Sequence, residues 1–252
     1  MKRTVLTILS IAFFMIAFSQ SDNTQGSVTY EEVIKFDIQM DNISAEMQAM
    51  MPKENRNSTI LYFNEDESRY ENLEKKEDGL IDEESEGGAV KIMISQPENI
   101  IYRDLKNKRT IKQTEFMTRV FLIESDYSND VWKLTGNQKM ILEFPCQEAI
   151  KNVDESEVIV WFTPAIPVSS GPAEYANLPG LVLEMHTDNG DRTIIATSID
   201  LKKITSDKIQ KPKKGKKVSS DEFRAIVEEK TKEMGGDGSS TGTQTVIMKI
   251  SQ

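Results

Sequence analysis

Residues 160–184 read VWFTPAIPVSSGPAEYANLPGLVLE, and this stretch decides how the chain folds. An apolar run ends at Phe162 and a second one begins at Leu181, each of a length typical of a strand. The segment between them cannot be a central strand, because proline lacks the amide donor that a sheet requires. Its prolines are Pro164, Pro167, Pro172 and Pro179. The stretch therefore predicts two strands joined by a stiff loop.

Two interpretations of this loop are open. As a structural element it would plug one end of a barrel, since a proline-stiffened apolar loop costs little entropy to hold in one shape. As a functional element it would form a docking surface or the rim of a pocket, because loops often carry binding residues. The candidate ligand- or partner-binding residues are Trp161, Phe162, Tyr175, Leu178, Pro179 and Gly180.

Period-two alternation of apolar residues dominates the rest of the chain. Apolar residues between Val28 and Ile38 fall mostly on one face of an extended segment, as in a half-buried strand. Further short runs cover 60–63, 90–94, 100–102, 116–123, 131–134, 140–144, 158–162, 181–185 and 193–201. With turn residues between most of them, they predict a mainly β fold: an antiparallel curved sheet or half-open barrel of lipoprotein-carrier or lipocalin-like shape.

Two helices are expected. The first covers 43–51 and ends before Pro52. The second is near the C-terminus, where Ser219 and Glu222 have the spacing of a capping box. An apolar stripe follows, which we expect to pack on the sheet, and a Gly-Gly pair ends the helix. The stripe consists of Phe223, Ile226 and Val227.

The N-terminus has the pattern of a cleaved secretory signal. A short basic start at Lys2 and Arg3 precedes an apolar run over 5–18, which is shorter than a membrane span requires. We expect a signal peptide over 1–20, a single β-rich domain over 21–234 and a flexible or edge-strand tail over 235–252. The location would be periplasmic or secreted, with no transmembrane segment after cleavage.

Residues 177–182 read NLPGLV, and the chain around them resembles the GLPGLI family of exported Bacteroidota proteins. The resemblance extends to an aromatic-Phe-Thr strand at Trp161 and to a Trp-x-Leu…Cys-x-x-Ala block over 132–149. Asn177 and Val182 depart from the name-giving motif; Asn tolerates the left-handed conformation of glycine, and Val replaces Ile as a β-branched residue. The family has no established biochemical activity, so the resemblance implies export and a fold rather than a reaction.

Composition argues against several functions. The formal net charge of −10 disfavours nucleic acid as a partner. Cys146 and His186 are the only cysteine and histidine, so no internal disulfide can form and a tetrahedral zinc site is not expected. A Cys146/His186 hydrolase stays an alternative, although no nucleophile motif surrounds the cysteine. We expect no cofactor.

Two unusual segments leave further alternatives open. Thioethers suit Cu(I), so the Met40–Met51 segment is a weak candidate for copper handling through Met47, Met50 and Met51, although methionine more often fills a core. Eight lysines over 202–217 form either a solvated connector or a contact for lipid head groups or an acidic partner. An acidic segment over 65–86 is typical of an exposed hairpin or loop.

Taken together, the sequence favours a non-enzymatic, exported binding or accessory protein. It would hold an apolar ligand in a β cavity, or dock on an outer-membrane or envelope protein through the proline-rich loop. The alternatives are copper handling by the methionine cluster and a cryptic cysteine hydrolase.

Overall fold

The computed structural model describes residues 23–35, 53–73, 79–85, 88–94, 99–127, 131–153, 156–187, 189–235 and 243–247. The expected signal peptide over 1–20 and the expected helix over 43–51 lie outside these residues, as does the methionine cluster.

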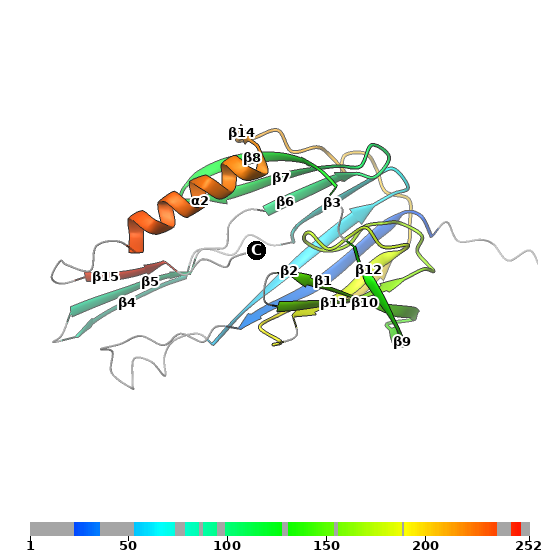
Figure 1. Cartoon of the computed structure of the whole chain (residues 1–252), viewed down its shortest axis with the longest axis horizontal. Coiled ribbons are helices and arrows are strands. Elements are labelled where there is room, and N and C mark those ends of the chain that lie inside the picture. Colours follow the sequence, from blue (N-terminus) through cyan, green and yellow to red (C-terminus); the bar gives the residue numbers. More distant parts are fainter. Residues whose placement is uncertain are drawn as a thin grey trace, which may run out of the picture.

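Twelve strands form one large sheet (Figure 1). In chain order they are β1 (Gly26–Lys35), β2 (Glu54–Phe63), β3 (Glu67–Asn72), β6 (Asn99–Asp104), β7 (Arg109–Phe116), β8 (Arg119–Asp126), β9 (Lys133–Ile141), β10 (Phe144–Val153), β11 (Ser156–Thr163), β12 (Leu181–Thr187), β13 (Arg192–Asp200) and β14 (Lys216–Val218). Their order across the sheet is β14-β8-β7-β6-β3-β2-β1-β13-β12-β11-β10-β9. All neighbours are antiparallel except β14 and β8.

A second, three-stranded sheet contains β4 (Gly79–Ser85), β5 (Gly88–Ile94) and β15 (Thr243–Ile247). Of the acidic segment 65–86, residues 79–85 form β4 in this sheet, and residues 65–72 belong to the β2–β3 hairpin of the large sheet. The C-terminal tail therefore contains an edge strand, which pairs in parallel with β5.

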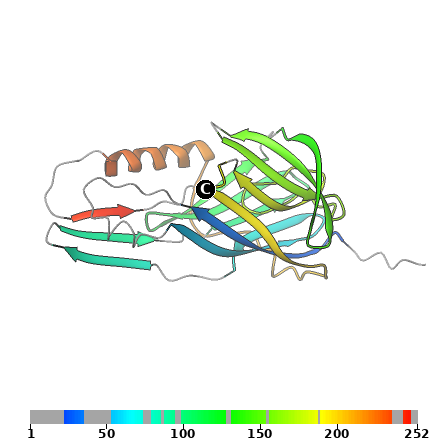
Figure 2. The same cartoon turned by 90° about the horizontal axis from the view of Figure 1, so that it is seen from below.

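The large sheet is open, with β9 and β14 at its two edges, and it curls without closing into a barrel (Figures 1 and 2). This confirms the predicted mainly β, antiparallel, curved architecture with a C-terminal helix.

Two hairpin turns lie inside apolar runs that the sequence pattern assigned to single strands. The apolar run 116–123 is interrupted by a tight turn at Met117 and Thr118, both with positive φ (50° and 62°), so it belongs to two strands, β7 and β8. The run 140–144 likewise contains a turn at Leu142 (φ 51°). Conversely, β9 continues through the gap between the predicted runs 131–134 and 140–144, with Gly136 (φ 87°) near an irregularity in its pairing with β10. Met, Thr and Leu rarely adopt positive φ, so no local signal marked these turns.

The helix α2 (Ser220–Gly235) begins with the predicted capping box. The Ser219 amide donates to Glu222 Oε2 at 2.8 Å, and the Glu222 amide donates to Ser219 Oγ at 3.2 Å. Phe223 and Ile226 pack on a small apolar cluster beside β8, while Val227 is half-buried outside that cluster. The cluster consists of Phe116, Phe121, Ile123 and Val218.

The main core lies inside the curl of the sheet, and the proline-rich loop fills it. Loop side chains join the same apolar cluster as side chains of β1, β2, β3, β6 and β10–β13. The loop also bonds to the start of β12: the Leu181 amide donates to Ile166 O at 3.1 Å, and the Val182 amide to Ser170 O at 3.0 Å. The loop is thus a layer of the core, which agrees with its structural interpretation as a plug.

We predict that Gly171→Ala destabilises the protein. A Cβ at this position would lie 2.3 Å from the Tyr175 carbonyl oxygen and 2.6 Å from Val182 Cβ, and neither neighbour can move without shifting the backbone. Overpacking of this kind lowers the free energy of unfolding by about 2 kcal/mol or more, measurable by urea denaturation. The control is Ala165→Ser, which adds one atom to an exposed side chain of the same loop and changes the free energy of unfolding by no more than about 0.5 kcal/mol. Equal losses in the two variants would contradict the close packing of the loop.

Candidate functional site

The residues proposed from the sequence as binding residues lie together, but mostly inside the protein. Trp161, Phe162, Tyr175 and Leu178 are at most 8% exposed, Gly180 is buried, and only Pro179 faces solvent. Contact of a ligand or partner with the buried side chains would require the loop to leave its place in the core.

Arg103 on β6 ties this loop to the sheet. Arg103 is only 3% exposed, and its guanidinium donates to the carbonyl oxygens of Gly171, at 3.1 Å, and Ala173. Burial lowers the pKa of Arg103 below its ordinary value. These two loop carbonyl oxygens have no strand partner and receive their hydrogen bonds from Arg103 instead. In return, the buried guanidinium has two hydrogen-bond acceptors.

Further polar contacts hold the loop along its length. Ser170 Oγ lies 2.7 Å from Ser68 Oγ, and the Trp132 indole donates to Ala176 O at 2.9 Å. Next to the loop, the Tyr30 hydroxyl donates to Val182 O at 2.7 Å from across the core. Ser68 is on β3 and Trp132 directly precedes β9, so the loop is bonded to both halves of the sheet.

A buried ion pair lies against the loop. Arg192 on β13 donates through Nε to Glu32 Oε1 at 2.9 Å, and both residues are less than 10% exposed. Arg192 also lies 3.9 Å from the Glu174 carboxylate and 5.7 Å from the centre of the Tyr175 ring. Burial opposes the charge on Arg192, but the two carboxylates outweigh it and raise the pKa of the guanidinium. The ion pair fixes one end of the loop.

We predict that Leu178→Ala lowers the free energy of unfolding by about 2–5 kcal/mol, because it leaves a cavity in the core beneath the loop. The neighbouring Pro179→Ala changes an exposed side chain and is the matched control; because it removes only the restriction of proline on the unfolded chain, it costs about 1 kcal/mol or less. Urea denaturation of both variants measures the difference. A nearly neutral Leu178→Ala would mean that the loop side chains contribute little to the core.

Cys146 and His186 are not brought together. The residue after Cys146, Gln147, pairs with Phe162, whereas His186 pairs with Ile159 on the same strand β11. Three residues of extended strand separate these positions by roughly 10 Å, which is beyond hydrogen-bond reach. The thiol is 1% exposed, and burial raises its pKa to about 11, so it is a poor nucleophile at neutral pH.

We predict that Cys146 resists alkylation by iodoacetamide at pH 8 in the folded protein and reacts rapidly in urea. The raised pKa and the burial act in the same direction, because both reduce attack by the thiolate. Mass spectrometry of the labelled protein measures the rate, with Cys146→Ser as the unlabelled control. Comparable rates with and without urea would restore the cysteine as a candidate nucleophile.

His186 instead joins a charged cluster on β12. Its Nδ1 lies 3.5 Å from Glu184, whose carboxylate accepts from Lys139 Nζ at 2.7 Å. The Lys139 ammonium lies 4.3 Å from the centre of the Trp161 ring, a cation–π contact. Burial alone would raise the pKa of Glu184, but hydrogen bonds from His186 and Lys139 outweigh it and lower that pKa. The cluster was not predicted, because its members are distant in sequence.

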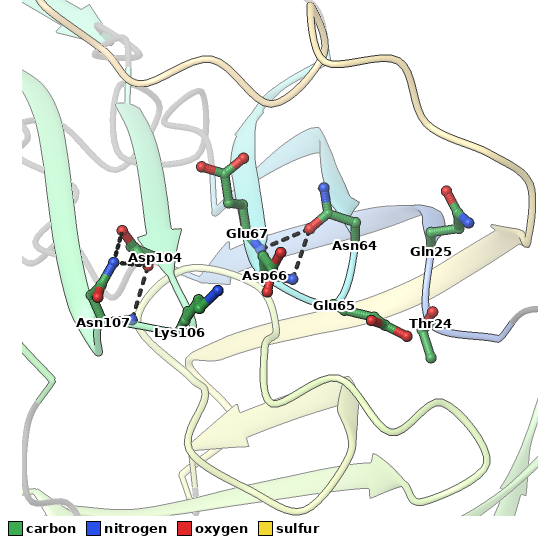
Figure 3. A pocket seen from close by; sticks show the side chains of 9 residues that line it. All are labelled: Thr24, Gln25, Asn64, Glu65, Asp66, Glu67, Asp104, Lys106 and Asn107. Carbon is green, nitrogen blue, oxygen red and sulfur yellow. Dashed lines mark hydrogen bonds between the residues drawn. The ribbon is translucent and has the colours of Figure 1, made fainter.

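A polar hollow of about 620 Å³ lies at the end of the large sheet (Figure 3). It is formed by three chain segments that meet there: the residues before β1, the β2–β3 turn and the β6–β7 turn. We call this the rim hollow. Its lining residues are Thr24, Gln25, Asn64, Glu65, Asp66, Glu67, Asp104, Lys106 and Asn107.

The turns that form the rim hollow are fixed by their own side chains. Asn64 Oδ1 accepts from the amides of Asp66 and Glu67 at 2.9 and 2.8 Å (Figure 3). Asp104 accepts from the Asn107 side chain and amide, and these bonds lower the pKa of the Asp104 carboxyl. The hollow therefore presents carboxylates, amides and one ammonium group in a set arrangement, which suits a ligand rich in hydroxyl groups.

A second polar hollow, of about 690 Å³, adjoins this one and shares Asp104 and Asn107. Within the described residues, no group of three or more His, Cys, Asp or Glu side chains has an arrangement that could hold a metal ion. The candidate copper residues Met47, Met50 and Met51 lie outside that part of the chain. Among the helices that the structure describes, none is long and apolar enough to cross a membrane.

Solved structures with a similar fold include two crystal forms of PNGF-II. Each superposes with a TM-score of 0.55 at 17% sequence identity. The matches cover 82% and 81% of this chain but only 34% and 33% of PNGF-II, so the chain spans about a third of that protein's length. At this identity the likeness shows the fold alone.

No curated protein matches the chain. A family of protein domains does: the model of the N-glycanase peptide, N-terminal domain, matches residues 52–224. This range runs from β2 into α2 and includes the buried loop and most of the rim hollow. The similarity indicates a β-rich accessory domain. Because the match covers more than half of the chain, the protein belongs to the family of N-glycanase peptide N-terminal domains.

Proposed function

We propose that the chain is an exported, non-enzymatic accessory domain that binds a carbohydrate at the rim hollow. The observation that carries this proposal is the set of fixed polar groups around a hollow of about 620 Å³. Sugars are recognised through hydrogen bonds from their hydroxyl groups to carboxylates, amides and ammonium groups, and the rim hollow offers all three.

The rigidity of the rim supports binding. Asn64 and Asp104 hold their turns through backbone hydrogen bonds before any ligand arrives, so little conformational entropy is lost on binding. The turns are short connections between paired strands, which restrict them further.

The family supplies the class of carbohydrate. Its description names an N-glycanase, so the glycan of an N-glycosylated protein is the ligand that we propose. Cys146 and His186 lie apart, which favours binding over catalysis. We keep export, a periplasmic or secreted location and membership of the GLPGLI family as parts of the proposal that rest on sequence.

The proposed contact differs from the two forms expected from the sequence. The described hollows at this end of the sheet are lined mainly by polar and charged residues, which suits a polar ligand better than an apolar one. The proline-rich loop contributes to the site indirectly, because its buried side chains pack against the strands whose ends form the rim hollow.

We predict that the triple variant Glu65→Ala, Asp66→Ala and Lys106→Ala binds N-linked glycopeptides at least tenfold more weakly than the wild type. These side chains line the rim hollow and are exposed, so their removal leaves the core intact. Isothermal titration calorimetry with glycopeptides from a digested glycoprotein measures the affinity.

The matched control replaces two acids and one lysine elsewhere, in Glu115→Ala, Glu143→Ala and Lys133→Ala, all of which are exposed. It should retain the wild-type affinity and melting temperature. No binding of glycopeptides by the wild type, or equal loss in both triples, would refute the rim hollow as a carbohydrate site.

A further inference from the structure

The lysine-rich segment between β13 and α2 is held against the large sheet. Ile209 and Pro212 are buried, and Arg69 Nη1 donates to Gln210 O at 2.5 Å. The Lys214 amide donates to the Gln113 side chain at 3.3 Å, and β14 then pairs with β8. The segment is therefore an ordered strap, and its lysines are presented in fixed positions.

We call its lysines the lysine row. All of them are exposed, and Asp207 is the only acidic residue between Leu201 and Val218. The row consists of Lys202, Lys203, Lys208, Lys211, Lys213, Lys214, Lys216 and Lys217. It is a concentrated positive charge on a chain whose net charge is −10.

Some of these lysines have partners on the protein. Lys202 pairs with Asp200, Lys211 lies 3.6 Å from Asp104, and Lys217 lies 3.5 Å from Glu124. Five lysines of the row remain. Three of these lie on β14 or directly before it, and none of the three makes an ion pair within the described residues: Lys213, Lys214 and Lys216.

Lys216 is on β14, the terminal strand of the large sheet, and Lys213 and Lys214 precede it in the chain, so the three charges lie together near this edge. Figure 1 shows β14 and the preceding segment along the upper rim of the molecule. Helix α2 packs beside this edge against Val218, and the lysines on and before β14 remain exposed.

We propose that the lysine row docks the protein on an anionic phospholipid bilayer. Clusters of four to eight basic residues bind acidic membrane surfaces, and each added lysine increases binding by roughly fivefold. Lys211 reaches Asp104 of the rim hollow, but Lys213, Lys214 and Lys216 do not line that hollow, and docking through them does not depend on carbohydrate binding.

Two properties favour a bilayer as the partner: the kind of basic residue in the row and the short range of electrostatic forces at physiological salt. The row contains lysine and no arginine, and lysine acts as a point charge without the bidentate geometry that recognises a single phosphate group. A surface of many head groups needs no such geometry. At physiological salt the Debye length is about 8 Å, so the negative charge on distant parts of the protein is largely screened from the membrane.

The test compares vesicle binding of the full chain and two triple variants. One variant carries Lys213→Gln, Lys214→Gln and Lys216→Gln. The control carries Lys35→Gln, Lys53→Gln and Lys133→Gln, which are exposed lysines outside the row and change the net charge by the same amount. Co-sedimentation at 150 mM salt uses phosphatidylcholine vesicles with and without 30% phosphatidylglycerol.

The apolar residues 5–18 can contribute to binding of both vesicle types equally. The ratio of binding to anionic and neutral vesicles therefore cancels this contribution. We expect the wild type and the control to prefer anionic vesicles and the row variant to lose about 100-fold of that preference. Equal preference in the two triples would overturn the proposal, because net charge alone would then explain binding. The proposal would also be overturned if the wild-type protein did not bind anionic vesicles more strongly than neutral ones. Binding of soluble polyglutamate by such a protein would identify the partner as an acidic macromolecule.

Discussion

The burial of one loop is the constraint on which the rest of the structure depends. A sheet of twelve strands that curls without closing leaves an apolar interior, and residues 164–180 fill it. A loop in a core must satisfy its backbone groups without a strand partner. Arg103 does this for two carbonyl oxygens, and the hydroxyl of Ser68 bonds to that of Ser170 in the loop. Without these donors and acceptors, the same apolar loop would be expensive to bury.

The class of fold can be predicted from the sequence, but the positions of some turns between strands cannot. Alternating apolar residues locate most strands, because a strand buried on one face leaves a period of two. The capping box at Ser219 locates the helix for an equally local reason. The turns at Met117 and Leu142 carry no Gly, Asn or Pro, so there the antiparallel pairing of flanking strands dictates a conformation that the turn residues do not favour.

The candidate site could be predicted only in part. The proline-rich loop is conspicuous in the sequence, but its apolar character fits both a docking surface and a core, and only the three-dimensional arrangement of β6 and β12 decides where the side chains point. The rim hollow has no signature at all. Its residues are ordinary turn residues from three places in the chain, and they become a site because antiparallel pairing brings the three turns to the same end of the sheet.

The position of β1 affects how the protein can fold. This strand lies between β2 and β13, so it joins the N-terminal half of the sheet to the C-terminal half, with Ser27 opposite Asp200. During synthesis β2 is available almost at once, but β13 follows more than 150 residues later. Contacts so distant in sequence form slowly, and until they form one edge of β1 exposes unpaired amides and carbonyls. The nascent chain therefore passes through a stage in which its most central strand is an open edge, and this is the stage at which a chaperone would be needed most.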